Sequence, residues 1–198
     1  MIRNHTELLN AIIEKYELKS YLEIGVQTTA NNFDKITAPF KMGCDPKVVG
    51  DARIYNCTSD QMFLALRQKF DLIFIDGLHH ADQVKRDFEN SLRVLNDNGF
   101  ILIHDCLPQN FQGTVVPRQT KVWWGDVYKF CMTLRFYSCI DFVTFNIDHG
   151  CCLIWKDRAK LGFQLPITIN WQTYCSLGKE LLKIKDEVVL PEFKKTLL

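Results

Sequence analysis

The chain has 198 residues, 47% of them hydrophobic and 12% aromatic, which is enough for one globular domain with a sizeable core. Its formal net charge of +1 argues against nucleic acid or an anionic membrane as a partner. No apolar run approaches the roughly 20 residues of a membrane span, and residues 1–16 lack the features of a signal peptide. We therefore predict a single cytoplasmic domain over residues 1–198.

The eight cysteines are scattered along the chain, and none belongs to a CxxC pair. This pattern favours neither zinc ligation nor a disulfide framework. A free cysteine in an apolar segment behaves as a small hydrophobic residue. We expect buried, reduced thiols.

The first part of the chain predicts alternating helices and strands. The expected helices cover residues 4–16, 31–36 and 58–69. The expected strands cover residues 21–26, 40–44 and 52–57. Asn4 with Glu7, and Thr58 with Gln61, have the spacing of helix capping boxes.

A continuous apolar run at residues 72–75 is typical of a strand that is buried on both faces of a parallel sheet, and it ends at Asp76. Residues 100–103 repeat the pattern and lead to Asp105. Apolar side chains at helical spacing lie between the two runs and predict a helix that ends at residues 98–99. Ligands bind beyond the carboxyl ends of strands in open α/β sheets, so Asp76 and Asp105 should share one rim.

Residues 107–122 contain two prolines and a glycine and have no apolar periodicity. A loop of this length inside a compact domain is usually functional or disordered. It follows the strand that leads to Asp105, so we expect a mobile lid or substrate loop over the rim.

The last part of the chain predicts a helix, a hairpin and a helical extension. The helix covers residues 127–136. Two apolar runs, at residues 141–147 and 151–155, flank a short turn and predict an antiparallel hairpin at the sheet edge. A helix over residues 170–184 belongs to a helical extension at about residues 165–198.

Several local motifs resemble the class I S-adenosylmethionine-dependent methyltransferases, in particular a group often found beside glycan-modifying genes. The motifs are YLEIGV at 21–26, GCDP at 43–46, FIDGLH at 74–79, IHDCLP at 103–108 and GDVYK at 125–129. The resemblance covers roughly residues 20–185. It implies a Rossmann-like α/β fold with a mostly parallel seven-stranded sheet, an antiparallel C-terminal hairpin and helices on both faces.

The same resemblance implies S-adenosylmethionine as the cofactor and an oxygen of a small-molecule or glycan acceptor as the methylated group. Asp45 lies 22 residues after Glu23, close to the spacing at which α/β nucleotide folds place a ribose-binding acid. Glu23 and Gly25 would lie near the methionine moiety, where a glycine allows close approach of the ligand. Asp76 is a further predicted cofactor-binding residue.

The cofactor loop departs from the family pattern, because Gln27 stands in the loop where a second glycine is usual. A domain that keeps the fold without methyl transfer is therefore an alternative. A nicotinamide-dependent oxidoreductase is less favoured, since the G-x-G-x-x-G fingerprint is absent from the sequence.

Two mechanisms are compatible with the rim residues. In catechol-type methyltransferases, carboxylates that match Asp76 and Asp105 help hold a divalent cation, but the third ligand position matches Cys106, a poor ligand for Mg²⁺. We therefore predict transfer without a metal and keep a divalent metal at Asp76 and Asp105 as the alternative. His104 or His79 is then the predicted general base, because the pKa of histidine lies near working pH.

The remaining predictions concern other histidines, two tryptophans and assembly. His5 is expected to be solvated, and His149 to lie in a turn. Trp123 and Trp124 could stack on a sugar or aromatic acceptor. A homo-oligomer is compatible with the sequence.

Overall fold

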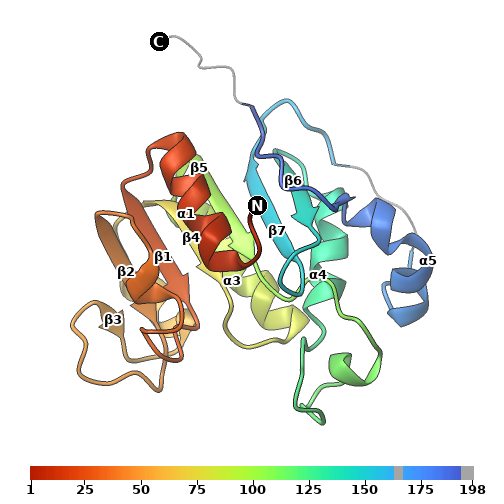
Figure 1. Cartoon of the computed structure of the whole chain (residues 1–198), viewed down its shortest axis with the longest axis horizontal. Coiled ribbons are helices and arrows are strands. Elements are labelled where there is room, and N and C mark those ends of the chain that lie inside the picture. The colour runs from red at the N-terminus through yellow and green to blue at the C-terminus, as the bar shows by residue number, and fades with distance from the viewer. Residues whose placement is uncertain (163–166, 193–198) are drawn as a thin grey trace.

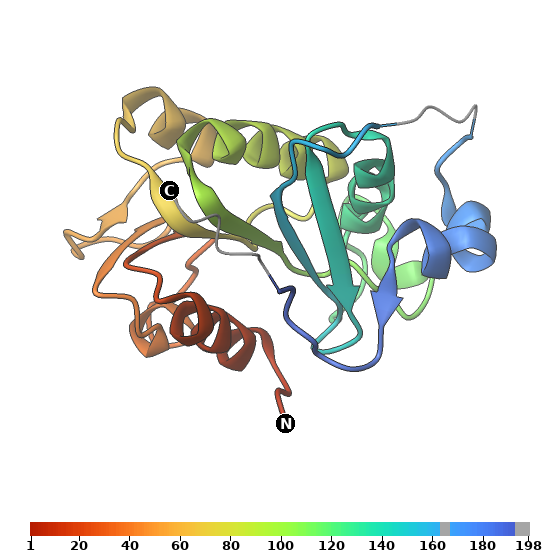
Figure 2. The same cartoon turned by 90° about the horizontal axis from the view of Figure 1, so that it is seen from above.

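The computed structural model describes residues 1–162 and 167–192. Its centre is an eight-stranded sheet in the order β3-β2-β1-β4-β5-β7-β6-β8, with helices on both faces (Figures 1 and 2). The strands are β1 Ser20–Ile24, β2 Phe40–Cys44, β3 Ile54–Tyr55, β4 Phe70–Ile75, β5 Leu95–Ile103, β6 Ile140–Phe145, β7 Cys151–Lys156 and β8 Ile184–Lys185. The α-helices are α1 His5–Tyr16, α2 Ser59–Ala65, α3 Ala81–Val94, α4 Val127–Thr133 and α5 Trp171–Leu181. Short 3₁₀ turns are η1 Phe33–Lys35, η2 Gln112–Thr114 and η3 Leu134–Phe136.

The predicted α/β alternation is confirmed, with parallel pairing from β3 through to β5 and antiparallel pairing of β7 with β5 and β6. The sheet has eight strands because β8 adds to β6 in parallel. The predicted hairpin is therefore formed, but it does not lie at the sheet edge. β7 lies between β5 and β6, and β6 lies between β7 and β8. Among the described residues, no helix has the length and apolar character needed to cross a membrane.

The C-terminal extension is only partly helical. After α5 the chain returns to the sheet as β8, so the helix ends before residue 184, the predicted end. Residues 163–166 and 193–198 of the predicted extension lie outside the described residues.

The end of α3 differs from the prediction at residues 98–99. Leu95 already pairs with Phe70 of β4, and the next pair is Phe100 with Leu72, so the residues between them bulge from β5. A Cβ atom on Gly99 would lie 2.8 Å from the Asp71 carbonyl oxygen. Gly99 therefore allows the chain to pass close to the Asp71 carbonyl oxygen. The pairing of Leu95 with Phe70 determines where α3 ends.

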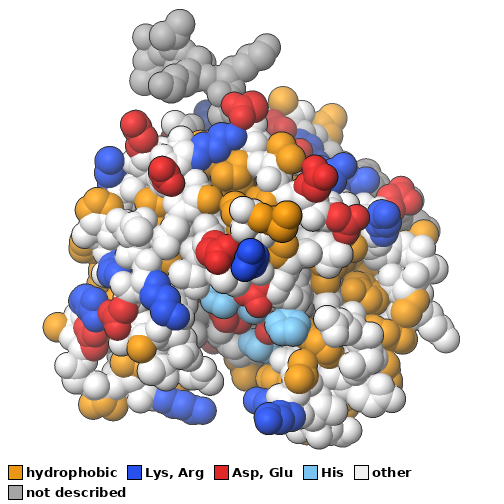
Figure 3. Space-filling view, viewed as in Figure 1, with side chains coloured by type: hydrophobic (Ala, Val, Ile, Leu, Met, Phe, Trp, Pro, Cys, Tyr) orange, Lys and Arg blue, Asp and Glu red, His pale blue; other side chains and the backbone are white. Residues whose placement is uncertain are grey.

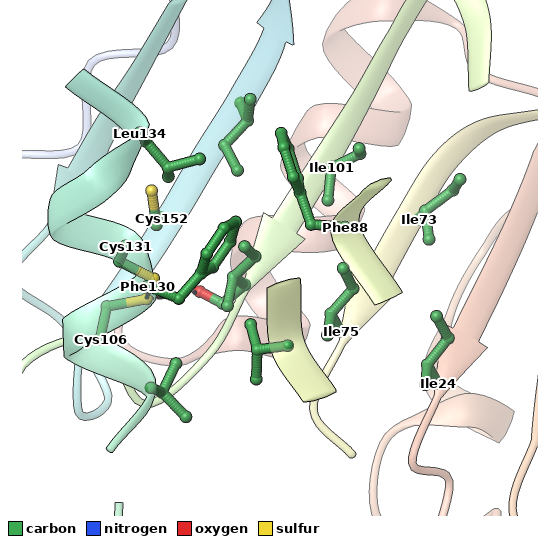
Figure 4. Close-up of a cluster of buried hydrophobic side chains, with 14 of the residues drawn as sticks. Ile24, Ile73, Ile75, Phe88, Ile101, Cys106, Phe130, Cys131, Leu134 and Cys152 are labelled. Atoms are coloured by element: carbon green, nitrogen blue, oxygen red, sulfur yellow. Dashed lines mark hydrogen bonds between the residues drawn. The ribbon is translucent and has the colours of Figure 1, made fainter. Parts of the chain in front are cut away.

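Two apolar cores lie on opposite faces of the sheet. The core under α1 contains Leu8, Leu9 and Ile12, and the other contains residues of α2, α3 and α4. In the second core, Phe88 and Phe130 pack against each other with ring centroids 5.3 Å apart, over isoleucines of the central strands (Figure 4). These cores hold the carboxyl ends of the parallel strands in register.

All eight cysteines are free, and five are buried: Cys44, Cys106, Cys131, Cys151 and Cys152. The expectation of buried thiols is therefore correct for most of them. Cys139 and Cys175 are exposed.

The end of α1 supplies a stability test. Glu17 adopts a left-handed conformation there, with φ 56° and ψ 38°. This conformation costs a side-chain-bearing residue about 1–2 kcal/mol, whereas glycine adopts it freely. We expect Glu17→Gly to raise the free energy of unfolding by roughly 0.5–1 kcal/mol.

Glu14→Gly, in the exposed interior of the same helix, is the matched control and should lower stability by about 1 kcal/mol. Urea denaturation measures both variants. A loss of stability in Glu17→Gly would contradict the role assigned to the left-handed conformation.

Candidate active site

The carboxyl ends of β1, β2, β4 and β5 border a cavity of about 780 Å³. Figure 3 shows histidine and acidic side chains gathered in a hollow on this side of the molecule. The cavity brings together all but one of the predicted site residues: Gly25, Asp45, Asp76, His79, His104 and Asp105. The cavity thus lies at the edge of the sheet where the rule for open α/β sheets predicts ligand binding.

Gly25 is required by the protein backbone itself. Its φ is +93°, and a Cβ atom there would lie 2.2 Å from the Asp76 carbonyl oxygen. The loops after β1 and β4 therefore touch at this point. Close approach of a neighbouring loop is thus one reason for this glycine. Gly25 also lines the cavity, and close approach of a ligand stays a prediction.

Asp45 holds the loop after β1 in place. Its carboxylate accepts hydrogen bonds from the Gln27 N–H at 2.8 Å and the Lys47 N–H at 2.7 Å. Gln27 has a φ of 54°, in the left-handed region that glycine favours. The bond to the charged Asp45 side chain helps offset the cost of this conformation, so the loop closes with Gln27 at the position where a second glycine was expected.

Glu23 lies away from the cavity, in contrast to the predicted cofactor contact. Its buried carboxylate accepts hydrogen bonds from the Tyr21 hydroxyl at 2.6 Å and the Asn32 amide at 2.8 Å. Tyr21 and Glu23 are two residues apart and so share one face of β1, the face covered by α1. Burial raises the pKa of Glu23 to about 7.

Four rim residues form a compact charged cluster. His104 Nδ1 lies 3.3 Å from Asp76 Oδ1 and 3.8 Å from Asp105 Oδ1. His79 Nδ1 lies 3.2 Å from Asp105 Oδ2, and its Nε2 lies 3.5 Å from Asp76 Oδ1. Both histidines thus lie within 4 Å of both carboxylates.

The electrostatics differ between the two carboxylates. Burial by itself would raise the pKa of Asp76, but His104 and His79 outweigh it and hold that pKa well below its usual value. Burial dominates at Asp105 and raises its pKa.

His104 is held as a cation by the groups on its two nitrogens. Nδ1 faces the Asp76 carboxylate at 3.3 Å, and Nε2 faces the Asp148 carbonyl oxygen at 2.6 Å. Both partners only accept hydrogen bonds, so both ring nitrogens carry protons. Burial would lower the pKa of His104, but Asp76 and the other nearby carboxylates raise it to about 10. This geometry argues against the predicted role of His104 as general base.

His79 has a ring nitrogen better suited to proton transfer. Its Nδ1 faces the Trp123 carbonyl oxygen at 3.2 Å as well as Asp105, so the proton belongs on Nδ1. The ring stacks on Trp123 with centroids 5.2 Å apart. The remaining nitrogen, Nε2, lies 3.5 Å from Asp76 Oδ1, and His79 lines the cavity. Burial lowers the pKa of His79, but Asp76 and Asp105 outweigh it, and the pKa is raised.

Sequence reasoning missed the role of the β6–β7 turn. The carbonyl oxygens of Asp148, His149 and Gly150 accept hydrogen bonds from His104 Nε2, Leu107 N and Cys106 N. All three turn residues have positive φ, at 45°, 67° and 94°. The turn therefore supports the loop after β5.

His5 is paired with this turn, in contrast to the expected solvated side chain. The Asp148 carboxylate accepts from the His5 backbone N–H at 2.9 Å and lies 2.6 Å from His5 Nδ1. Nothing in the local sequence around either residue marks this contact between distant parts of the chain.

The predicted lid loop is folded against the rim. Within it, Gly113 and Thr114 are buried, and the Trp123 indole donates to the Val115 carbonyl oxygen at 2.8 Å. Arg118 lines the cavity and stacks over Trp123 at 5.9 Å. Its mobility stays a prediction.

A metal could be held at the rim by Asp76, His79 and Asp105, whose ligand atoms all lie within 4.8 Å of one another. Cys106 is turned away, with its Sγ 3.2 Å from the Ile103 carbonyl oxygen and 3.3 Å from Cys131 Sγ. Two carboxylates and one imidazole suit a transition metal better than Mg²⁺. For the metal alternative, the rim therefore favours a transition-metal ion over Mg²⁺.

The mixed eight-stranded sheet with helices on both faces has the Rossmann-like fold of solved methyltransferases. A family model described as a methyltransferase domain matches residues 9–106, just under half of the chain. This match agrees with the enzyme class expected from the sequence motifs. No curated protein matches the chain.

Solved methyltransferases share the fold. The SAH-bound methyltransferase PaMTH1 from Podospora anserina is 20% identical, with 77% of each chain covered and a TM-score of 0.55. The O-methyltransferase TomG from Streptomyces achromogenes, in complex with SAM, is 12% identical, with 76% of this chain and 78% of that chain covered and a TM-score of 0.55. The methyltransferase MycE, in complex with Mg, SAH and mycinamycin VI, is 16% identical, with 80% and 50% covered and a TM-score of 0.53. At these identities the likeness establishes the fold.

The charge of His104 can be tested directly. We expect its imidazole ¹⁵N resonances to show both nitrogens protonated from pH 6 to pH 8.5. Because its pKa is raised above the unfolded value of about 6.5, its contribution to stability is complete below pH 6.5 and is lost as pH rises through about 10.

Asp76→Asn is the matched variant, since it removes the charge while keeping the shape of the side chain. Titration of His104 should then move to lower pH. A neutral His104 in the wild-type protein at pH 7.5 would contradict the assignment.

Proposed function

We propose that the protein is an S-adenosylmethionine-dependent methyltransferase that transfers a methyl group to an oxygen of a small-molecule or glycan acceptor. The observation that carries this proposal is a cavity lined by Gly25, Asp45 and the Asp76–His79–Asp105 rim. The family match over residues 9–106 supports the enzyme class. Neighbours solved with SAM or SAH bound support the cofactor.

The donor half of the cavity would bind the cofactor around Asp45. A carboxylate at the end of β2 can accept hydrogen bonds from both ribose hydroxyls, and the two backbone donors on Asp45 leave further lone pairs available. Gly25 and Gly77 border the same space with backbone atoms. Glu23 would act indirectly, by fixing Asn32 beneath the loop.

The acceptor half lies between the rim and the lid loop. The cofactor supplies a methyl group activated on a sulfonium, so the protein must align the acceptor and take up one proton. We assign that proton to His79 Nε2, with Asp105 and the Trp123 carbonyl orienting the opposite nitrogen. His104 balances the charge of Asp76.

The narrower family group and the kind of acceptor are also part of this proposal. The sequence motifs support membership in the group found beside glycan-modifying genes, and Trp123 offers an aromatic surface near His79 for a sugar or aromatic acceptor. Cytoplasmic location and homo-oligomer formation stay predictions from the sequence.

Ligand-induced stabilisation separates the enzyme classes. SAM or SAH should raise the melting temperature, as expected for any ligand that binds only the folded state, and NAD should leave it unchanged. Stabilisation by NAD alone would favour the oxidoreductase. Binding of SAH without transfer to any hydroxyl acceptor would favour the binding-protein alternative.

Asp45→Ala should weaken SAH binding about tenfold to a hundredfold, because it removes charge-assisted hydrogen bonds of roughly 1.5–3 kcal/mol. Isothermal titration calorimetry measures the change. The control is Asp51→Ala, since Asp51 pairs with Arg53 and does not line the cavity. Equal affinity in folded Asp45→Ala and wild type would exclude the ribose contact.

His79→Gln should lower kcat by about 10²–10⁴-fold, since glutamine cannot take up the proton, and should leave SAH affinity nearly unchanged. The pKa of His79 is raised above its usual 6.5, and the neutral form is the active one. Wild-type activity should therefore rise with pH through a value above 6.5, and the variant should lack this rise. A variant with wild-type kcat would show that another residue acts as the general base.

Chelation distinguishes the two mechanisms. We expect transfer to survive EDTA treatment, because His79 and His104 already compensate the rim carboxylates. Complete loss of activity on chelation, restored by added Mg²⁺ or Mn²⁺, would instead assign Asp76 and Asp105 as metal ligands.

A further inference from the structure

A second group of side chains with metal-binding atoms lies beyond the rim, on the Nε2 side of His104. Its members are His5, His104 and Asp148, and one ligand atom from each lies within 4.8 Å of the others. His5 Nδ1 is 2.6 Å from Asp148 Oδ2, and His104 Nε2 is 3.7 Å from the same oxygen. The two imidazole rings meet edge to face, with centroids 4.8 Å apart. Three segments distant in sequence thus bring nitrogen and oxygen donor atoms within 4.8 Å of one another.

The donor set suits a borderline transition metal. Two imidazole nitrogens and one carboxylate oxygen are typical ligands of Zn²⁺, which binds them at about 2.0–2.2 Å. Tetrahedral ligands at that distance stand about 3.3 Å apart, between the two separations from Asp148 Oδ2. The Asp148 carbonyl oxygen, 2.6 Å from His104 Nε2, is a further oxygen donor beside the same point.

The surroundings also fit a metal site. A histidine that binds a metal through one nitrogen usually donates its other N–H to a carboxylate, and His104 Nδ1 faces Asp76 at 3.3 Å. The Asp148 carboxylate is oriented by the His5 backbone N–H at 2.9 Å. The His5 and Asp148 side chains are 22% and 24% exposed, so an ion can reach them from solvent.

We propose that His5, His104 and Asp148 form a binding site for Zn²⁺ or a similar transition-metal ion. The ion would take the place of the proton on His104 Nε2 and leave the Nδ1–H bond to Asp76 unchanged. It would join the start of α1, the end of β5 and the β6–β7 turn. The site shares no ligand residue with the Asp76–His79–Asp105 group, although His104 Nδ1 contacts Asp76, and it does not depend on methyl transfer.

The test is titration of Zn²⁺ into the full-length protein by calorimetry, with Co²⁺ absorption as a spectroscopic readout of nitrogen and oxygen ligation. The variants are His5→Ala, which removes one ligand of the proposed site, and His79→Ala, which removes one ligand of the rim group. His80→Ala is the matched control, since His80 belongs to neither group. Circular dichroism without metal checks that each variant folds.

We expect one Zn²⁺ site that weakens at least tenfold in His5→Ala and is retained in His79→Ala and His80→Ala. Zn²⁺ should raise the melting temperature of the wild-type protein and not that of His5→Ala. If His5→Ala does not fold, Asp148→Asn gives the same test. Absence of Zn²⁺ binding to the wild-type protein, or binding lost in His79→Ala and kept in His5→Ala, would overturn the proposal.

Discussion

The rim depends on one ion pair, in which the His104 imidazolium bridges the Asp76 carboxylate and the Asp148 carbonyl oxygen. Asp76 and Asp105 follow neighbouring strands, and two carboxylates so close in a partly buried cluster repel unless a cation compensates them. A protonated His104 supplies that charge without a bound ion. It also fixes the turn at Asp148, which in turn supports the loop after β5. The nearby His79 lies beside the same two carboxylates, with Nδ1 on Asp105 and Nε2 on Asp76.

The donor side of the cavity rests on backbone contact. Gly25 lets the loops after β1 and β4 touch, and Asp45 holds Gln27 in a conformation that glycine adopts more easily. If Asp45 also binds the ribose, as proposed, cofactor binding and the shape of this loop depend on the same carboxylate. The loop after β1 therefore closes without a glycine at position 27, because the Asp45 carboxylate holds Gln27 in its left-handed conformation.

Local patterns predicted the parts of the fold that local forces determine. Apolar runs and capping residues identified the central strands and the starts of α1 and α2, and the strand ends identified Asp45, Asp76 and Asp105. The end of α3 was misplaced because pairing of Leu95 with Phe70 overrides the turn signal. Glu23 was misplaced because β1 is buried on both faces, so no alternation shows which face it occupies. The His5–Asp148 contact could not be predicted, since it joins residues 143 positions apart.

The distribution of thiols gives the protein a built-in reporter of unfolding. Cys106 and Cys131 are buried side by side in the core, where burial raises the pKa of both well above its usual range. An alkylating reagent attacks the thiolate, so these residues stay unmodified while the core is closed. Cys139 and Cys175 are exposed and should react first. The delay between the two groups measures how often the core beneath the rim opens.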